Sequence, residues 1–168
     1  GNRDFLLGEQ YAACCGMQLL PELYAIEINQ QRVLLAHGDQ FCTQDVAYQQ
    51  FRALVRNPDW QREFLAKSLV ERRAIAAQLR AKSKEANSIK AEDIMDVTPA
   101  EVDAALEKYQ CSVLIHGHTH RPAVHALTVG NAVQAERIVL GDWEEQYCYL
   151  QWENGAHELR WERAPAQS

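Results

Sequence analysis

A run of histidines directly after an apolar stretch constrains the fold of this chain most. The stretch Cys111 to Ile115 has the length and composition of a short buried strand, and His116-Gly117-His118-Thr119-His120 follows it at once. Residues two apart on extended backbone point to the same side, so the spacing predicts that His118 and His120 face one site. Loops at the carboxyl ends of strands carry the sites of α/β sheets. The run therefore predicts an α/β fold with a metal-binding loop, with His116 beneath the ligands or in the core.

A second strand-like stretch ends in the same way. Arg32 to Ala36 runs into His37-Gly38-Asp39, which makes His37 a candidate for a third imidazole ligand. Near the start of the sequence, Asn2 offers an amide, a weak metal ligand, and Arg3 offers a planar guanidinium that matches a phosphate group. His37 alone is equally well explained by a structural role. Together with the later run, these residues predict a metal site that hydrolyses phosphoesters.

The charge of the candidate ligands adds a further constraint. Imidazoles and an amide carry no negative charge, whereas two divalent cations a few ångströms apart repel each other and normally need a bridging carboxylate. The sequence has no Asp-x-His segment to supply one. Two interpretations stay open: one zinc ion held by imidazoles, or a two-metal site whose acidic ligands lie upstream of Gly1.

The rest of the pattern alternates between strands and helices. A helical pattern runs from Asp45 to about Ala91 and is broken at Asn57-Pro58, and Thr98-Pro99 with Glu101 predicts a capped helix start. Asn154-Gly155 predicts a hairpin turn. Strands are expected over 23–28, 32–36, 111–115, 136–140, 147–152 and 157–161. This order predicts a layered α/β fold with a helical insertion.

Composition excludes several classes of protein. A net charge of −6 argues against a general nucleic-acid binder. Lys and Arg nevertheless outnumber Asp and Glu between Arg52 and Lys90, which indicates either a solvated helical face or a surface that meets phosphates or an acidic membrane. No apolar run approaches the roughly 20 residues of a membrane span. The five cysteines follow no disulfide or zinc pattern, so we expect reduced and mostly buried thiols in the cytoplasm.

Four blocks of the sequence resemble motifs of the calcineurin-like metallophosphoesterases and, within that superfamily, of the UDP-2,3-diacylglucosamine pyrophosphohydrolase family of lipid A biosynthesis. The blocks are Gly1–Leu6, His37–Asp45, Ser83–Ser88 and Leu114–Ala123. The resemblance extends from Gly1 to about Trp161. It implies a β-sandwich flanked by helices, with a helical lid inserted over about 46–91. It also implies that residues 1–168 are the carboxyl-terminal two-thirds of such a domain, with further strands and the Asp-x-His and Gly-Asp motifs upstream of Gly1.

The resemblance also implies roles for particular residues. Two Mn²⁺ ions are expected in the complete enzyme, one held by Asn2, His37 and His118 and the other completed by His120, with the remaining ligands upstream of Gly1. Catalytic roles fall on Asn2, Arg3 and His118. Contacts with the substrate are implied for Asn2, Arg3, Asp45, Arg80, Ser83, Asn87, Lys90 and His118.

The implied reaction is the hydrolysis of the pyrophosphate bond of UDP-2,3-diacylglucosamine to UMP and 2,3-diacylglucosamine 1-phosphate by a metal-activated water. The substrate is a lipid-linked nucleotide sugar, so the enzyme is expected in the cytoplasm, peripheral on the inner face of the inner membrane. We expect residues 1–168 alone to be nearly inactive, because the acidic ligands are missing. Two alternatives are a generic phosphoesterase acting on soluble nucleotides and a metal-binding fragment without catalysis.

Overall fold

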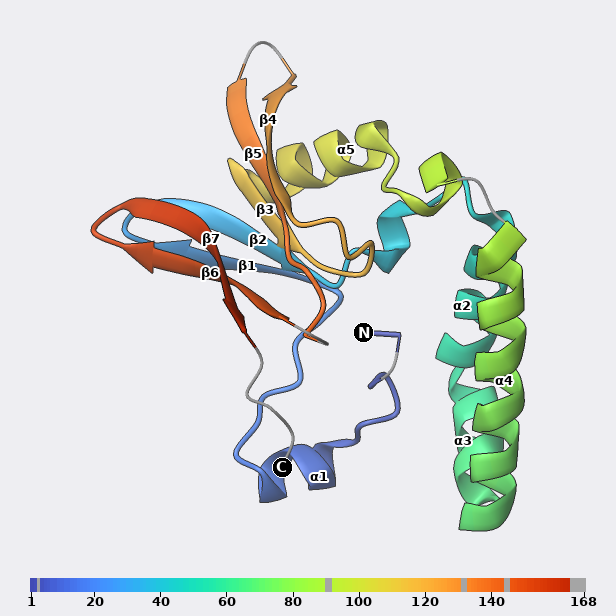
Figure 1. The fold of residues 1–168 in the computed structure, drawn as a ribbon. Helices are drawn as coiled ribbons and strands as arrows, with labels where there is room; N and C mark the ends of the chain where they lie inside the picture. The colour runs from blue at the N-terminus through green and yellow to red at the C-terminus, as the bar shows by residue number, and fades with distance from the viewer. Residues whose placement is uncertain (3, 90–91, 131–132, 144–145, 164–168) are drawn as a thin grey trace.

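A mixed sheet forms the centre of the molecule (Figure 1). The computed structural model describes residues 1–2, 4–89, 92–130, 133–143 and 146–163. Within these ranges five strands pair in the order β1-β2-β3-β5-β4, with β2, β3 and β5 parallel and the outer strands antiparallel to their neighbours. The strands are β1 (Leu23–Ile28), β2 (Gln31–Ala36), β3 (Val113–His116), β4 (Ala123–Val129) and β5 (Val133–Val139). The predicted α/β class is confirmed.

Strands β2 and β3 lie at the centre of the sheet, and their apolar residues are buried on both faces. Leu34 and Leu114 point to one side and Val33 and Val113 to the other, and each is fully buried. A strand covered on both faces needs no polar alternation, so the short apolar runs seen in the sequence are those of buried parallel strands. The sheet therefore fixes where the loops after β2, β3 and β5 emerge.

Helix α5 (Pro99–Tyr109) covers one face of the sheet. Val102 and Leu106 of this helix pack with Leu34 and Leu114 in one core cluster. The helix begins where Thr98-Pro99 predicted. The prediction that the Thr98 side chain caps it is wrong, because that side chain makes no hydrogen bond to the helix end. The Thr98 hydroxyl instead lies 2.7 Å from the Thr43 hydroxyl, so tertiary contact has taken the side chain away from the helix end.

A hairpin covers the other face. Strands β6 (Gln146–Glu153) and β7 (Ala156–Arg163) pair antiparallel around Asn154 and Gly155, both with positive φ, as the Asn-Gly signal predicted. Cys148 and Leu159 of the hairpin share a second core cluster with Val33, Val113 and Ile138 of the large sheet. The two sheets thus bury a common layer of side chains.

Helices also fill the segment expected to be helical over 46–91. They are α2 (Val46–Arg56), α3 (Pro58–Ala66) and α4 (Leu69–Ile89), and they stand together beside the sheet at the right of Figure 1. Asn57 caps α3 by accepting hydrogen bonds from the backbone N–H groups of Asp59 and Trp60, which explains the break at Asn57-Pro58. No helix in the described part of the chain has the length and apolarity to cross a membrane.

Several short elements were not predicted. They are α1 (Glu9–Cys14), the 3₁₀ turns η1 (Asp39–Phe41) and η2 (Glu92–Met95), and strand β4. Strand β4 alternates between half-buried and exposed residues, but Ala123, His125 and Ala126 give its period-two pattern little hydrophobic contrast.

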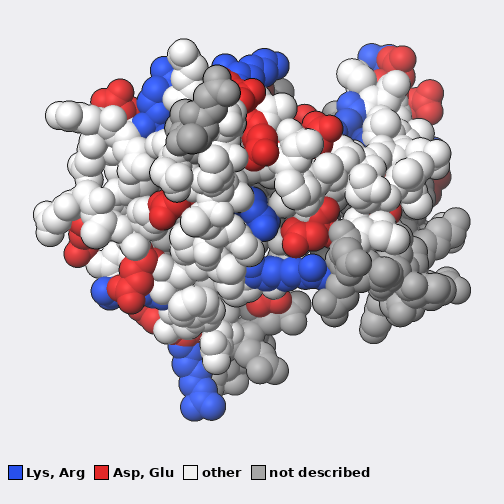
Figure 2. Space-filling view, turned by 90° about the horizontal axis from the view of Figure 1, so that it is seen from above, with Lys and Arg blue, Asp and Glu red and all other residues white. Residues whose placement is uncertain are grey.

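Figure 2 shows acidic and basic side chains interspersed over the face seen from above.

Candidate functional site

The carboxyl ends of the parallel strands bring the candidate loops to one edge of the sheet. Ala36, His116 and Val139 lie side by side in the register of β2, β3 and β5. Backbone hydrogen bonds continue past the strand ends: the Gly117 N–H donates to the His37 carbonyl at 3.0 Å, and the Leu140 N–H donates to the His116 carbonyl at 2.7 Å. Residues that lie about 80 positions apart in the sequence are therefore neighbours here.

Three of the predicted ligand residues meet at this edge. The rings of His37 and His118 lie with their centroids 5.1 Å apart, at 66° to each other. The backbone N–H of Asn2 donates to Nε2 of His37 at 3.3 Å, which brings the start of the chain to the same place. The structure thus joins Asn2, His37 and His118 from three distant segments.

The loop of His118 and His120 differs from the extended backbone expected from their spacing. The Thr119 N–H donates to the Gly117 carbonyl at 2.8 Å, which makes a three-residue turn around His118. His118 and His120 have φ of +65° and +53°, a region that residues other than glycine seldom adopt. The expectation of extended backbone is wrong here, because the turn closes against the His37 loop. His118 faces His37, whereas His120 lies with Nδ1 3.5 Å from a carboxylate oxygen of Asp142.

Both imidazoles of the pair are uncharged near neutral pH. The pKa of His37 is lowered to about 4, mainly by burial; the charge of Asp39 opposes this shift and the neighbouring His118 adds to it. Burial also lowers the pKa of His118. A neutral imidazole keeps a lone pair, which is the state that a metal ion binds.

The pair fits part of a metal site rather than a whole one. Neutral imidazoles suit divalent iron or zinc, and divalent manganese where oxygen ligands join them. In the ranges that the structure describes, however, no group of three or more His, Cys, Asp or Glu side chains lies close enough together to hold a metal ion. A cation at this edge would need oxygen ligands beyond His37 and His118, in keeping with the charge argument from the sequence.

Asp39 connects the site to helix α2. The residue is 1% exposed, and one carboxylate oxygen accepts hydrogen bonds from the Tyr48 hydroxyl and from Nε of Arg52, each at 3.0 Å. Arg56 lies 3.6 Å from the same oxygen. Burial alone would raise the pKa of Asp39, but Arg52, His37 and the hydrogen bonds outweigh it, so the pKa is lowered and the group stays ionised.

Tyr48 and Arg52 were missed by sequence reasoning. The available signal was the spacing of Tyr48, Arg52 and Arg56, which lie four residues apart and so share one face of α2. That spacing identifies one face of α2, but it does not predict which residues this face contacts.

Comparison with known proteins places the chain in a family. It is 56% identical over 144 residues to the UDP-2,3-diacylglucosamine hydrolase of Bordetella pertussis, covering 86% of this chain and 55% of that protein. The enzyme of the same name from Cellvibrio japonicus is 56% identical over 146 residues, covering 87% and 60%. That of Serratia proteamaculans is 46% identical over 159 residues, covering 95% and 66%.

The chain belongs to the UDP-2,3-diacylglucosamine hydrolase family. It spans between 55% and 66% of the length of these three relatives. No family model matches it. A solved structure of vacuolar protein sorting 29 from Cryptosporidium parvum has a TM-score of 0.36 and 11% identity, covering 87% of this chain and 58% of that one, a likeness too weak to define the fold.

The family's proposed substrate contacts lie in several places. Asp45 is buried and accepts a hydrogen bond from the Tyr48 N–H at 3.0 Å, so it caps α2. Arg80 and Ser83 are exposed on α4. Asn87 lies within the bounds of α4, but its side chain is outside what the structure describes, as are Arg3 and Lys90 altogether.

His116 lies beneath the site, as predicted. It is 1% exposed, with Nδ1 2.9 Å from the Gly117 carbonyl and Nε2 3.4 Å from Arg137. Arginine can only donate, so Nε2 accepts and Nδ1 carries the proton. Burial lowers the pKa of His116 to about 4. A Cβ at Gly38, whose φ is +109°, would lie 2.7 Å from Nδ1 of His116, so this close approach requires glycine.

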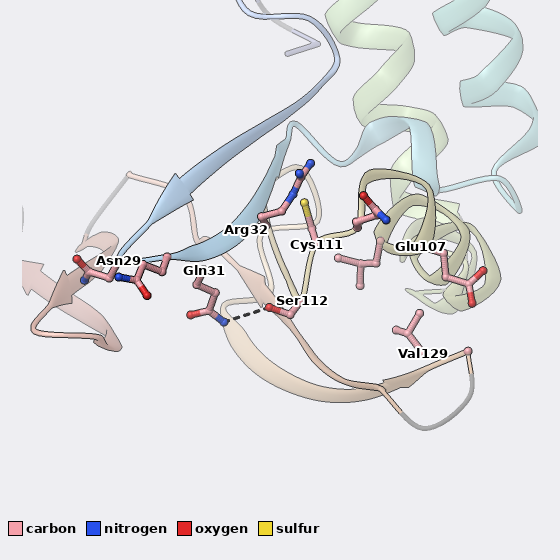
Figure 3. Close-up of a pocket in the computed structure, with 11 residues that line it drawn as sticks. Asn29, Gln31, Arg32, Glu107, Cys111, Ser112 and Val129 are labelled. Carbon is pink, nitrogen blue, oxygen red and sulfur yellow. Dashed lines mark hydrogen bonds between the residues drawn. The ribbon is translucent and has the colours of Figure 1, made fainter.

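Two hollows flank the sheet at opposite ends. One of about 340 Å³ adjoins the site and is lined by His120, Asp142, Gln146 and Trp161 among others. A larger one of about 690 Å³ lies at the start of β2 and β3, where the Gln31 amide donates to the Ser112 hydroxyl (Figure 3). The larger hollow lies at the far end of the sheet from the histidine pair, and its lining combines amides such as Gln31 and Gln110 with the apolar side chains of Leu106 and Val129.

Proposed function

We propose that the protein hydrolyses the pyrophosphate bond of UDP-2,3-diacylglucosamine to UMP and 2,3-diacylglucosamine 1-phosphate, in lipid A biosynthesis. The observation that carries this proposal is the 46% to 56% identity, over 86% to 95% of the chain, to hydrolases named for that substrate. The pair of neutral imidazoles at the carboxyl ends of β2 and β3 supports it. Because the relatives are longer, the activity is proposed for the whole protein.

We propose two Mn²⁺ ions as the cofactor. Asn2, His37 and His118 would hold one ion and His120 the other, with carboxylate ligands from outside residues 1–168. Bound divalent cations would supply an activated water and positive charge for the phosphoryl oxygens. The facing rings of His37 and His118, with the backbone of Asn2 beside them, support this proposal by bringing residues of three segments to one place.

The chain's own residues would bind and orient the substrate. Arg3 would neutralise the charge that builds up on the phosphoryl oxygens in the transition state. The phosphate on the lipid-bearing sugar would be bound by Asp45, Arg80, Ser83, Asn87, Lys90 and His118. Ser83 and Arg80 support this assignment by being exposed, since a side chain that binds substrate must be accessible.

The architecture would be a calcineurin-like β-sandwich with a lid. The core shared by the five-stranded sheet and the β6–β7 hairpin supports a sandwich. Helices α2–α4 would be the lid over the acyl chains, and the exposed apolar side chains of Leu54, Leu65 and Leu69 support that role. Their basic side chains would meet anionic headgroups on the cytoplasmic face of the inner membrane.

The test is a matched pair of histidine variants in the protein at the full length of its relatives. With UDP-2,3-diacylglucosamine as substrate, His118→Gln is expected to lower the release of UMP at least about 100-fold, because a ligand is lost. His157→Gln is the control, because His157 pairs with Glu136 near the opposite end of the sheet at 3.1 Å. Wild-type turnover in His118→Gln, or no UMP from the unmodified protein, would overturn the proposal.

A further inference from the structure

Tyr48 is fixed at both of its ends. Its backbone N–H donates to the Asp45 carboxylate and its hydroxyl donates to the Asp39 carboxylate, each at 3.0 Å. Both acceptors are buried, with 6% of Asp45 and 1% of Asp39 exposed. A half-buried side chain held in this way has little freedom to change rotamer.

The ring of Tyr48 lies against His118. Their centroids are 5.1 Å apart at an interplanar angle of 41°, and His118 has His37 on another side at the same centroid distance. His118 sits at the centre of the tight turn described above, with φ of +65°. A residue in so sparsely populated a conformation needs its surroundings to hold it. Among the described residues, the rings that lie against His118 are those of Tyr48 and His37.

Asp39 links this contact to the loop of His37. It follows His37 by two residues, and its charge is balanced by Arg52 and Arg56 of α2. Arg52 in turn pairs with Glu22 at 2.5 Å, which anchors α2 to the segment before β1. One buried carboxylate therefore ties the His37 loop to the helix that carries Tyr48.

We propose that Tyr48 is a positioning residue for the His118 ring, and that Asp39 acts through Tyr48 by holding its hydroxyl. This inference rests on the proposed function, in which His118 takes part in the hydrolysis. Because Tyr48 orients the ring before substrate arrives, its loss should lower the rate of the chemical step more than it weakens substrate binding, in which His118 also takes part under the proposed function.

The first test is spectroscopic and needs no activity. In the metal-free protein at the full length of its relatives, the imidazole resonances of His118 are measured by ¹H–¹⁵N NMR. Tyr48→Leu removes the ring and is expected to shift these resonances strongly, whereas Tyr48→Phe keeps the ring and is expected to shift them less. Tyr149→Phe is the matched control, because it also removes a hydroxyl–carboxylate bond, to Glu162, on the exposed hairpin. It is expected to leave His118 unchanged.

The second test is kinetic. Tyr48→Leu is expected to lower kcat about tenfold and Tyr48→Phe by a smaller factor, because a misplaced group costs rate. A smaller rise in KM is expected alongside, because His118 is also a proposed phosphate contact. Thermal unfolding of each variant is followed alongside, and Tyr48→Phe carries the decision if Tyr48→Leu unfolds. Tyr149→Phe is expected to keep the wild-type kcat.

The outcomes separate this inference from the proposed function. If His118→Gln abolishes turnover while the folded Tyr48 variants keep the wild-type kcat and His118 resonances, the positioning role is overturned and the hydrolase stands. If His118→Gln keeps wild-type turnover, the proposed function is overturned. A graded loss of kcat from Tyr48→Phe to Tyr48→Leu, with matching shifts of the His118 resonances, supports the inference.

Discussion

At the scale of single residues, the site is defined by what burial does to imidazoles. Burial lowers the pKa values of His37 and His116 to about 4, but the two rings have different surroundings. His37 lies beside His118, whereas His116 has each ring nitrogen near a protein group. The sequence predicted this division, because His116 directly follows the apolar run, and in the structure it is the last residue of β3. It could not predict Tyr48, whose contact depends on how α2 docks.

The buried His116 ring should make the protein less stable in mild acid. Its folded pKa of about 4 lies below its ordinary value of 6.5, so the unfolded chain takes up a proton first as the pH falls. Its contribution is complete above pH 6.5 and is lost as the pH falls towards 4. From this group alone, the free energy of unfolding should fall by about 2 kcal/mol between about pH 7.5 and about pH 5.

Urea unfolding of the wild type and His116→Gln at those two pH values checks this prediction. The buried carboxylates contribute equally to both proteins, so the difference between their pH dependences isolates the imidazole. His116→Gln should be less stable overall but less sensitive to acid. An equal loss of stability in both proteins would contradict the prediction.

At the scale of elements, the sequence predicted best where one pattern decided the structure. The apolar runs of β2 and β3 and the Asn-Gly turn between β6 and β7 needed no tertiary information. The pattern failed where tertiary contacts decide, as at Thr98, whose hydroxyl turns to Thr43. The prediction of extended backbone at His118 was wrong for the same reason, because the turn there closes against a loop from a distant strand.

The exposed leucines of helices α3 and α4 lead to a prediction about how the KM depends on the acyl chains of the substrate. Leu65 and Leu69 are 46% and 62% exposed, so Leu65→Gln and Leu69→Gln should leave the fold intact. If these side chains contact acyl groups, each replacement should raise KM for UDP-2,3-diacylglucosamine roughly tenfold, because about 1.5 kcal/mol of apolar burial is lost.

Steady-state kinetics with the acylated substrate and a deacylated analogue check this prediction. The analogue should respond little to either leucine variant. Val124→Gln is the control, because Val124 is 45% exposed on β4, outside the three helices. Equal changes for both substrates would favour a phosphoesterase that acts on soluble nucleotides.

At the scale of the whole molecule, the described residues bury two core layers on the faces of the five-stranded sheet but bring only two imidazoles together at its edge. Among the described side chains, His37 and His118 pair without a third His, Cys, Asp or Glu near enough to complete a metal site. Residues 1–168 should therefore bind fewer than two Mn²⁺ ions, and the protein at the length of its relatives should bind two. Calorimetric titration with Mn²⁺ measures both numbers, and two tight sites in residues 1–168 alone would contradict the prediction.

The register between β2 and β3 has a consequence for how the site comes into being. His37 and His118 meet only after the chain between them, with helices α2 to α5, has closed on itself and the two strands have paired. Such closure over a long stretch of chain is slow, because its entropy is lost before any contact compensates for it. A cation that engages both rings can thus be captured only late in folding, and its capture would lock a strand pairing that is already in place.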